Sequence, residues 1–440
     1  MDKVQENIVV RSKGFLHPIC RLPTEILQQI FEECVDVEAA EWFVDPTRPP
    51  TILKSATRIA GTCRSWYAIA RQTPRMWNRL SAPIREVSFR KNEKIYTTAG
   101  REVFSRSLRL CGNIPLEVTI PEYVLTRTLE TFMVLKIDRL NIYDMRRFAL
   151  RAHPSPSPRH LWVGSGDSDH TYTQVLPSTL ISRTTTITVH NITVAIPEGS
   201  NLVTQLILCG VQDGFRLTSL LESLPCLTKL DASRALVVDH YEQDHRALTH
   251  QNLRHLRLSI SCMNALKEYL ADGLQLPNLS CFGLANHPVS RSKRCDPLHY
   301  TPASFPSVFA RLPTTVTSLE VHGNDAVTPS SASSLIKTFY RIDTISTYGS
   351  AAGVIPRALC RTRDMPEGEK PSEKESLPRS IQALHIHDYL GDGEDLYPAL
   401  HQVYNDTGPI EIFFDDCPNI LPTIRREFTH VGTIAARPSH

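Results

Sequence analysis

The chain has 440 residues, of which 41% are hydrophobic and 21% are charged, and its formal net charge at pH 7 is +2. These proportions exclude a disordered chain, and the near-neutral charge gives no electrostatic footprint for nucleic acid. The length suffices for two or three ordinary domains, or for a small domain followed by a repeat array.

The chain begins with an N-terminal extension, residues 1–17, that has no hydrophobic signal core. No stretch of the sequence approaches 18 consecutive apolar residues, so we expect no membrane span and no membrane partner. The 11 cysteines are scattered and include no Cys-x-x-Cys pair. We therefore expect reduced thiols and a protein of the cytoplasm, the nucleus or both.

The first predicted module spans residues 18–82 and consists of three short helices. Pro23 suits the first position of a helix, and Glu25 lies in the first turn, where the helix dipole favours a negative charge. An apolar stripe follows at helical spacing, and two further helical patterns continue until Pro74, which ends the third. Such a small trio is marginal alone, so it is either a cap on the main domain or a docking module.

Two motifs in this module resemble the F-box. The first reads Leu22-Pro23-x-Glu25-Ile26-Leu27-x-x-Ile30-Phe31. The second reads Cys63-Arg64-x-Trp66-x-x-Ile69-Ala70 and continues as Pro74-x-x-Trp77. They are similar to the F-box-like domain that is abundant in mushroom-forming fungi, which carries a Pro-containing insert after its first helix, here Asp36–Pro50. Thr62 departs from the family, which usually has an apolar residue before the Cys.

The resemblance implies docking to a Skp-family adaptor and, through it, to a cullin–RING ubiquitin ligase. It assigns one set of residues to adaptor binding, although some of them would instead lie in the core of the module. These residues are Leu22, Pro23, Ile26, Leu27, Ile30, Phe31, Cys63, Trp66 and Trp77.

A joint over residues 83–128 follows the module. Ile84–Phe89 and Leu116–Ile120 alternate apolar and polar residues, which predicts strands, and Arg101–Leu110 between them predicts a helix.

From residue 129 to the end, the hexapeptide apolar-x-x-apolar-x-apolar recurs. Clear copies start at positions 137, 158, 184, 203, 227, 253, 279, 316, 381 and 409, and a degenerate copy lies near Ile342. The first seven starts differ by 21, 26, 19, 24, 26 and 26 residues, which is the leucine-rich-repeat period of one strand and one returning helix. Larger steps indicate insertions near 287–303 and 357–378.

We therefore expect an α/β fold in which an irregular leucine-rich-repeat solenoid, a curved parallel sheet with outer helices, follows the helical module. A non-repeating α/β domain with similar strand spacing is the alternative. Helices are expected over Phe215–Leu224, Met263–Ala271, Ser304–Leu312, Ser333–Tyr340, Leu396–Tyr404 and Ile420–Phe428.

Motifs for catalysis or metal binding are few. There is no phosphate-binding glycine loop and no His-Glu-x-x-His. His385 and His387 would lie on one side of a strand and, with Asp388, have zinc-ligand chemistry, but exposed positions of a concave sheet explain them better. We expect no metal, no cofactor and no enzymatic activity.

The repeat frame instead predicts a binding surface, because residues that flank the second and third apolar positions point to the concave face. Trp, Tyr and Arg dominate binding energetics at interfaces. The residues predicted to contact a protein target are Arg139, Tyr143, His160, Trp162, Arg257, His322, His385, His387 and Phe413. The sequence thus predicts the substrate-recognition subunit of a Skp/cullin/F-box ligase, or alternatively a leucine-rich-repeat interaction scaffold without a ligase role.

Overall fold

The structure is a computed structural model, and it describes part of the chain. The described residues are 18–44, 54–81, 84–90, 93–99, 101–120, 136–143, 157–164, 173–197, 200, 202–213, 217–238, 247–259, 262–285, 311–323, 332, 336, 341–361, 381–391, 393–407, 410–415, 417 and 420. Two compact units divide the chain. The first comprises Met1–Asp167 and Thr179–Thr184, and the second comprises Ser168–Ser178 and Thr185–His440.

The first unit begins with the predicted N-terminal helical module. Its elements are η1 (Pro18–Arg21), α2 (Thr24–Val44), α3 (Lys54–Thr62), α4 (Arg64–Arg71) and η2 (Pro74–Trp77). Leu27, Phe31 and Val35 recur at helical spacing on α2, and all three are buried. α4 ends at Arg71, Thr73 is the residue before η2, and Pro74 opens the short η2, as its fixed φ and missing N–H allow.

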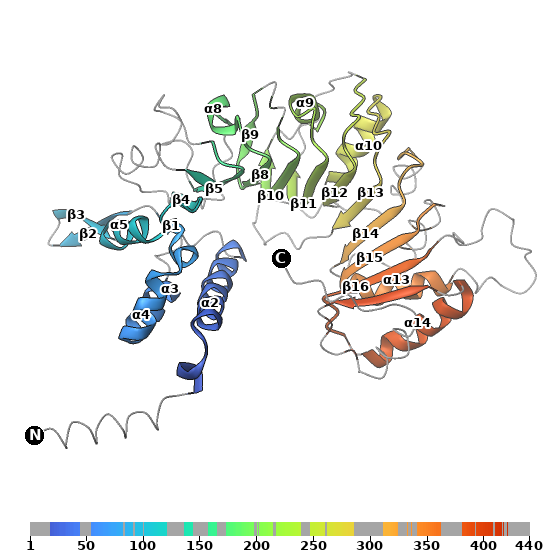
Figure 1. Cartoon of the computed structure of the whole chain (residues 1–440). Helices are drawn as coiled ribbons and strands as arrows, with labels where there is room; N and C mark the ends of the chain where they lie inside the picture. Colours follow the sequence, from blue (N-terminus) through green and yellow to red (C-terminus); the bar gives the residue numbers. More distant parts are fainter. Residues whose placement is uncertain are drawn as a thin grey trace, which may run out of the picture. The chain divides into compact units, whose positions relative to one another are not determined.

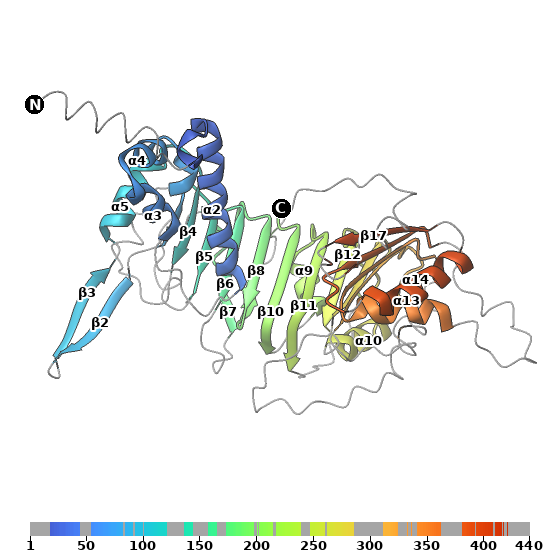
Figure 2. The same cartoon turned by 90° about the horizontal axis from the view of Figure 1, so that it is seen from below.

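The joint continues the first unit with β1 (Arg79–Ser81), β2 (Ile84–Arg90), β3 (Glu93–Ala99), α5 (Arg101–Leu110) and β4 (Leu116–Ile120). The predicted strands β2 and β4 and the predicted helix α5 are confirmed. The pattern missed β3, which pairs antiparallel with β2 in a two-stranded sheet (Figure 2). β1 pairs parallel with β4, which pairs parallel with β5 (Ile137–Ile142), and β5 pairs with β6 (His160–Gly164).

The second unit is dominated by parallel strands that follow one another in chain order. They are β8 (Thr186–His190), β10 (Gln205–Asp213), β11 (Lys229–Val238), β12 (His255–Ser259), β13 (Cys281–Ala285), β14 (Ser318–Gly323), β15 (Thr344–Gly349), β16 (Ala383–His387) and β17 (Glu411–Asp415). β7 (Thr173–Val175) and β9 (Thr193–Ala195) form a separate pair. Among the described strands, thirteen form one sheet, in the order β1-β4-β5-β6-β8-β10-β11-β12-β13-β14-β15-β16-β17.

Helices connect several of these strands. They are α8 (Ser178–Ile181), α9 (Leu217–Ser223), α10 (Met263–Ala271), α13 (Ala351–Arg361) and α14 (Gly393–Thr407). Figure 1 shows α9 and α10 on the outer side of the curved run of strands. None of the described helices is both long enough and apolar enough to cross a membrane.

The recurring hexapeptide explains the strands. Every predicted copy overlaps one of the parallel strands, including the degenerate copy, which becomes β15. In β10, Leu206 and Leu208 are buried, while the flanking Gln205 and Ile207 are half-buried on the other side of the strand. In most copies the first apolar position precedes the strand and is also buried, as in Val203 and Leu253, whereas Ile137 is the first residue of β5.

Side-chain hydrogen bonds join the turns that precede successive strands. Thr184 Oγ1 donates to the carbonyl of Pro158 at 2.9 Å, and Asn252 Nδ2 donates to the carbonyl of Pro225 at 2.8 Å. Asn278 Nδ2 donates to the carbonyl of Gln251 at 2.7 Å. These bonds satisfy carbonyls where the chain enters the sheet, so each turn is tied to the turn before it.

The structure describes only some of the other predicted helices and insertions. Three predicted helices lie within or close to α9, α10 and α14. The helices predicted over Ser304–Leu312, Ser333–Tyr340 and Ile420–Phe428 fall largely outside the described residues, although positions 332 and 336 are helical. The insertion at 287–303 also lies outside them, as does the N-terminal extension 1–17. The insertion predicted at 357–378 begins inside α13, so its first five residues are helical instead.

Candidate functional site

The helical module presents an apolar stripe that its own core does not use. At about 100° per residue, Ile30 lies roughly 40° from Ile26 around α2, whereas Leu27 and Phe31 lie roughly 100° and 140° from Ile26. Leu22 is 36% exposed, Ile26 is 40% exposed, and Ile30 is half-buried beside them. Pro23 is exposed at the start of the same stripe. The first motif therefore holds two stripes, one packed inside the module and one partly exposed to solvent.

The motif residues after α2 serve the module itself in different ways. Trp77 is 3% exposed, and its Nε1 donates to the carbonyl of Ala70 at 2.7 Å. Trp66 is half-buried, with its ring centroid 4.9 Å from that of Phe31. Cys63 is exposed and caps α4, because its Sγ accepts from the backbone N–H of Trp66 at 3.4 Å. Of the nine residues that the resemblance assigns, Leu27, Phe31 and Trp77 are core residues.

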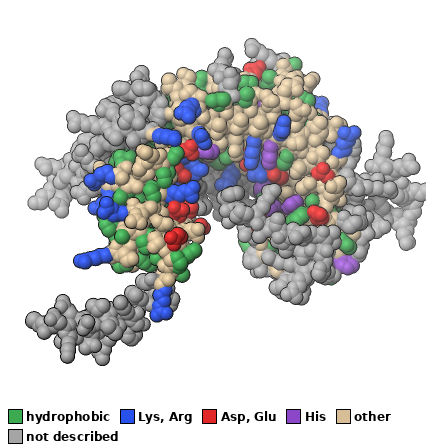
Figure 3. All heavy atoms as spheres, viewed as in Figure 1, with side chains coloured by type: hydrophobic (Ala, Val, Ile, Leu, Met, Phe, Trp, Pro, Cys, Tyr) green, Lys and Arg blue, Asp and Glu red, His purple; other side chains and the backbone are tan. Residues whose placement is uncertain are grey.

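In the second unit, charged and aromatic side chains gather on the inner face of the curved sheet. Figure 3 shows Lys, Arg and His side chains there, with acidic ones among them. The parallel register aligns these positions in rows across the strands. One row holds Asp231, Arg257, Gly283, Glu320, Ser346, His385 and Phe413. Charges and rings from strands far apart in sequence therefore become neighbours.

Arg257 is the centre of this row. Its Nη1 donates to Asp231 Oδ2 at 3.1 Å, and its Nε donates to Glu320 Oε2 at 2.8 Å. Its Nη2 also donates to Glu320 Oε2. To reach β14 from β12, the side chain crosses Gly283, where an added Cβ would lie 2.7 Å from Arg257 Cγ. A side chain at position 283 would block this path, so the glycine makes the pairing possible.

The electrostatics of the row follow from this pairing. Burial alone would raise the pKa of Glu320, but the hydrogen bond from His255 and the charge of Arg257 outweigh it and lower the pKa to about 2. Burial alone would lower the pKa of Arg257, and the charges of Glu320 and Asp231 raise it instead. Both groups are therefore held in their ionised forms.

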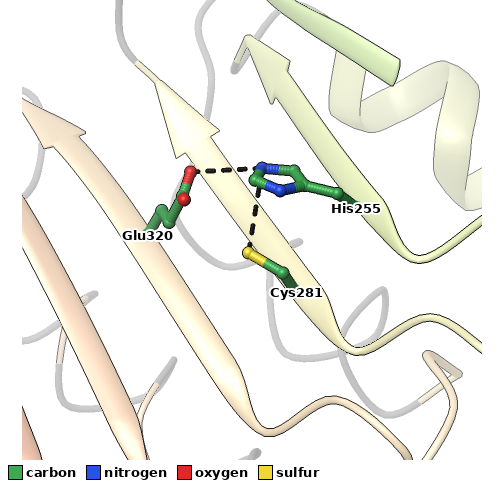
Figure 4. A group of neighbouring side chains, drawn as sticks. All are labelled: His255, Cys281 and Glu320. Carbon is green, nitrogen blue, oxygen red and sulfur yellow. Dashed lines mark hydrogen bonds and ion pairs between the residues drawn. The ribbon is translucent and has the colours of Figure 1, made fainter. Parts of the chain in front are cut away.

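His255, Cys281 and Glu320 converge from three neighbouring strands beside this pair (Figure 4). His255 Nε2 lies 3.8 Å from Cys281 Sγ and 3.4 Å from Glu320 Oε2. Burial and the nearby charge of Glu320 raise the pKa of Cys281 to about 12, so the thiol is protonated as the group stands. Nitrogen, sulfur and oxygen donors thus meet at one point on the inner face.

A stack of rings runs beside the charged row. His322 and Tyr348 stack with centroids 3.8 Å apart, and Tyr348 and His387 stack at 4.4 Å. His385 stacks on Phe413 at 4.5 Å. Burial and the charge of Arg257 lower the pKa of His322 to about 4. Among the described residues, no hydrogen-bond partner reaches the buried Nε2 of His322.

The predicted target-binding residues of the first unit form a cluster of their own. Tyr143 and Trp162 lie with ring centroids 4.7 Å apart. Arg139 lies 4.0 Å from Glu117, and burial together with the charge of Arg139 lowers the pKa of His160. The remaining five predicted residues, Arg257, His322, His385, His387 and Phe413, belong to the second unit. The prediction therefore covers two clusters, one in each unit.

The repeat frame places Asp231, His255 and Glu320 on the concave face, although they are not among the predicted target-contact residues, and sequence reasoning missed Cys281 and Tyr348. The sequence signal for most of these residues is their position beside an apolar position of the hexapeptide. It applies to Asp231, His255, Cys281 and Glu320. Tyr348 follows the degenerate copy, where the pattern is weakest. The contacts among these residues depend on the register between strands, which no local pattern encodes.

Comparison with known proteins identifies the N-terminal module. The family model for the F-box-like domain matches residues 19–82. None of the curated proteins compared with the chain matches it. The match covers both motifs and every helix from α2 to α4, and the exposed stripe of α2 lies inside it. The chain therefore carries an F-box-like domain at residues 19–82.

Proposed function

We propose that the chain is the substrate-recognition subunit of a Skp/cullin/F-box-type ubiquitin ligase. The observation that carries the proposal is a pair of exposed apolar side chains within the F-box-like domain, Leu22 just before α2 and Ile26 on its exposed stripe. F-box domains generally bind Skp-family adaptors. Apolar side chains that no core residue covers are what such docking requires, because burying them provides the driving force.

The second part of the proposal assigns target binding to the inner face of the sheet. Parallel strands at repeat spacing, with helices on the outer side of several of them, support a leucine-rich-repeat solenoid. Its inner face carries Arg257, Tyr348 and Phe413 among partly exposed histidines. Aromatic and arginine side chains of this kind are the ones that provide most binding energy at interfaces.

In this proposal the chain contributes recognition and no catalysis. Ubiquitin transfer would belong to the cullin–RING subunits that the adaptor recruits, in the cytoplasm or nucleus. The alternative is a leucine-rich-repeat scaffold that keeps the helical module only as a cap. The two differ in one property, which is whether the exposed stripe of α2 binds an adaptor.

Co-purification with a recombinant Skp-family adaptor tests the proposal. The variant Leu22→Ala/Ile26→Ala removes exposed apolar side chains and leaves the buried stripe intact. If even one of the two is an interface residue with a hot-spot energy of about 2 kcal/mol, capture should weaken by at least roughly 30-fold. The wild-type chain should be captured stoichiometrically.

A matched control is Leu202→Ala/Leu390→Ala, which removes two exposed leucines of the second unit, 53% and 74% exposed. This control should be captured as the wild type is. Absence of wild-type capture, or equal capture of the Leu22/Ile26 variant, would favour the scaffold alternative and remove the ligase role.

A further inference from the structure

We propose that His255, Cys281 and Glu320 bind a zinc ion on the inner face of the second unit's sheet. Zinc accepts imidazole nitrogen, thiolate sulfur and carboxylate oxygen together, and it takes four ligands in tetrahedral geometry. The three side chains supply one donor atom of each kind, and these atoms all lie within 4.8 Å of one another. The site lies outside the F-box-like domain and does not depend on adaptor binding.

The distances between the donor atoms fit a tetrahedral ion. Zinc–ligand bonds of about 2.0–2.3 Å place neighbouring nitrogen and oxygen ligands roughly 3.4 Å apart, and neighbouring nitrogen and sulfur ligands roughly 3.6 Å apart. The His255 Nε2 to Glu320 Oε2 distance is 3.4 Å, and the His255 Nε2 to Cys281 Sγ distance is 3.8 Å. Two of the three donor pairs are thus close to tetrahedral separations, and the third pair, Cys281 and Glu320, lies within 4.8 Å.

The sheet holds these donors in place. His255 on β12 lies directly opposite Cys281 on β13, and Glu320 on β14 lies one diagonal step away. Figure 4 shows the three side chains pointing toward one another from adjacent parallel strands. Donors on neighbouring strands lose little freedom on binding, since the backbone that carries them is already ordered.

The charged row completes the surroundings of the ion. Arg257 donates two hydrogen bonds to Glu320 Oε2. Because a carboxylate has two oxygens and about four lone-pair positions, Glu320 can keep these bonds and turn its other oxygen to a metal. Arg257, anchored in turn by Asp231, fixes the orientation of that carboxylate, which is the usual role of an outer-shell partner.

The charges also balance. Asp231, Glu320 and a Cys281 thiolate would carry three negative charges. A zinc ion and the Arg257 guanidinium would carry three positive ones. Zinc lowers the pKa of a coordinating thiol far enough to deprotonate it, so binding would release the proton that Cys281 holds in the metal-free site.

The site is accessible and incomplete. The side chain of His255 is 22% exposed and that of Glu320 is 13% exposed, so an ion can enter from solvent. Three protein ligands leave the fourth position of a tetrahedral ion to water. The group differs in this respect from a closed structural site, in which four protein ligands surround the metal.

Cobalt loading of the full-length protein tests the proposal. The chain is stripped with a chelator and titrated with Co²⁺, which gives a thiolate-to-cobalt absorption band and strong ligand-field bands in a tetrahedral sulfur-containing site. One equivalent should bind with both features, and one equivalent of Zn²⁺ should abolish them. Cys281→Ser should lose the thiolate band. It should also weaken zinc binding by more than the roughly 10–100-fold that loss of an outer-shell partner costs.

Because other thiols also bind metal, Cys226→Ser serves as the matched control. Cys226 is half-buried in the same unit and should leave the cobalt spectrum unchanged. His255→Gln provides a second variant should Cys281→Ser fail to fold, and circular dichroism without metal checks the fold of each. Equal zinc content in the wild type and in either site variant would overturn the proposal and leave the group as a hydrogen-bonded network. A wild-type cobalt spectrum without a thiolate band would do the same.

Discussion

At the scale of single residues, the inner face of the second unit depends on a position without a side chain. Gly283 faces Arg257 across one strand pair and Glu320 across the next. Its missing Cβ leaves the space through which the guanidinium passes over β13. A glycine inside a strand normally weakens it, and this one is explained by a close approach of a neighbouring side chain.

Gly283→Ala should destabilise the second unit. The new Cβ would lie 2.7 Å from Arg257 Cγ, so the arginine must move away from Glu320, and we expect a loss of about 1–3 kcal/mol in denaturant unfolding. Gly61→Ala is the control, because no atom lies within 4 Å of the added Cβ in α3. That change should gain about 0.5–1 kcal/mol, and a similar gain at 283 would show that Arg257 does not cross there.

His322 should make the second unit sensitive to mild acid. Burial and Arg257 lower its pKa from 6.5 to about 4 in the folded chain. Above pH 6.5 the histidine is neutral in both the folded and the unfolded chain, so it does not affect the free energy of unfolding. Between pH 6.5 and 4 only the unfolded chain takes up the proton, and the free energy of unfolding therefore falls. We expect a loss of up to about 3 kcal/mol over this range.

The measurement is denaturant unfolding at several pH values for the wild type and for His322→Phe, which keeps a ring to stack on Tyr348. The phenylalanine variant should lose less stability than the wild type between pH 6.5 and 4. His401→Asn, on an exposed position of α14, should follow the wild type. Parallel curves for wild type and His322→Phe would contradict the assignment.

At the scale of elements, the two tryptophans of the helical module separate core from surface. Trp77 on η2 is almost fully buried and closes a hydrogen bond back to α4, whereas Trp66 on α4 is half-buried against Phe31. η2 therefore fastens the end of the module, although it is only four residues long.

Trp77→Ala should destabilise the helical module by about 3–5 kcal/mol, the usual range for a buried tryptophan. Trp66→Ala should cost less, since part of its ring stays in contact with water in the folded chain. Thermal unfolding monitored by circular dichroism would measure both. Equal losses would mean that the half-exposed ring packs as tightly as the buried one.

At the scale of the whole molecule, each strand of the second unit from β10 to β16 pairs with the strand before it and the strand after it in this series. The turns before the strands repeat this order, because Thr184, Asn252 and Asn278 each bond to the preceding turn. Stability in such an arrangement is a sum of neighbour interactions, with few contacts between distant parts.

Hydrogen exchange should therefore vary along the series. Among the described strands, β17 pairs with β16 alone, so its amides should exchange faster than those of β12 and β13, which are paired on both sides. Exchange measured by mass spectrometry on peptides from each strand would show this difference. Uniform protection from β11 to β17 would indicate that the unit opens as one cooperative block.

Much of this fold could be predicted from the sequence. Alternating apolar residues marked the strands, since each one buries a single face, and capping and proline signals marked the helical module. The helix α13 was not predicted, because Pro356 inside it argues against a helix, and β3 has too weak an alternation to stand out. The donor group at Cys281 could not be predicted, because its partners lie 26 and 39 residues away and meet only through strand register.

The register of the parallel strands is unbroken from β11 to β17, and it fixes the spacing of side chains on the inner face. Neighbouring strands are about 4.8 Å apart, and alternate residues along one strand are about 6.6 Å apart. A helix laid across the strands offers a new turn every 5.4 Å, close to the spacing from Asp231 to Arg257 and onward. An extended segment laid along the strands matches the longer interval. The spacing of the sheet therefore links the direction in which a bound chain lies to its conformation: a helix fits across the strands, and an extended segment fits along them.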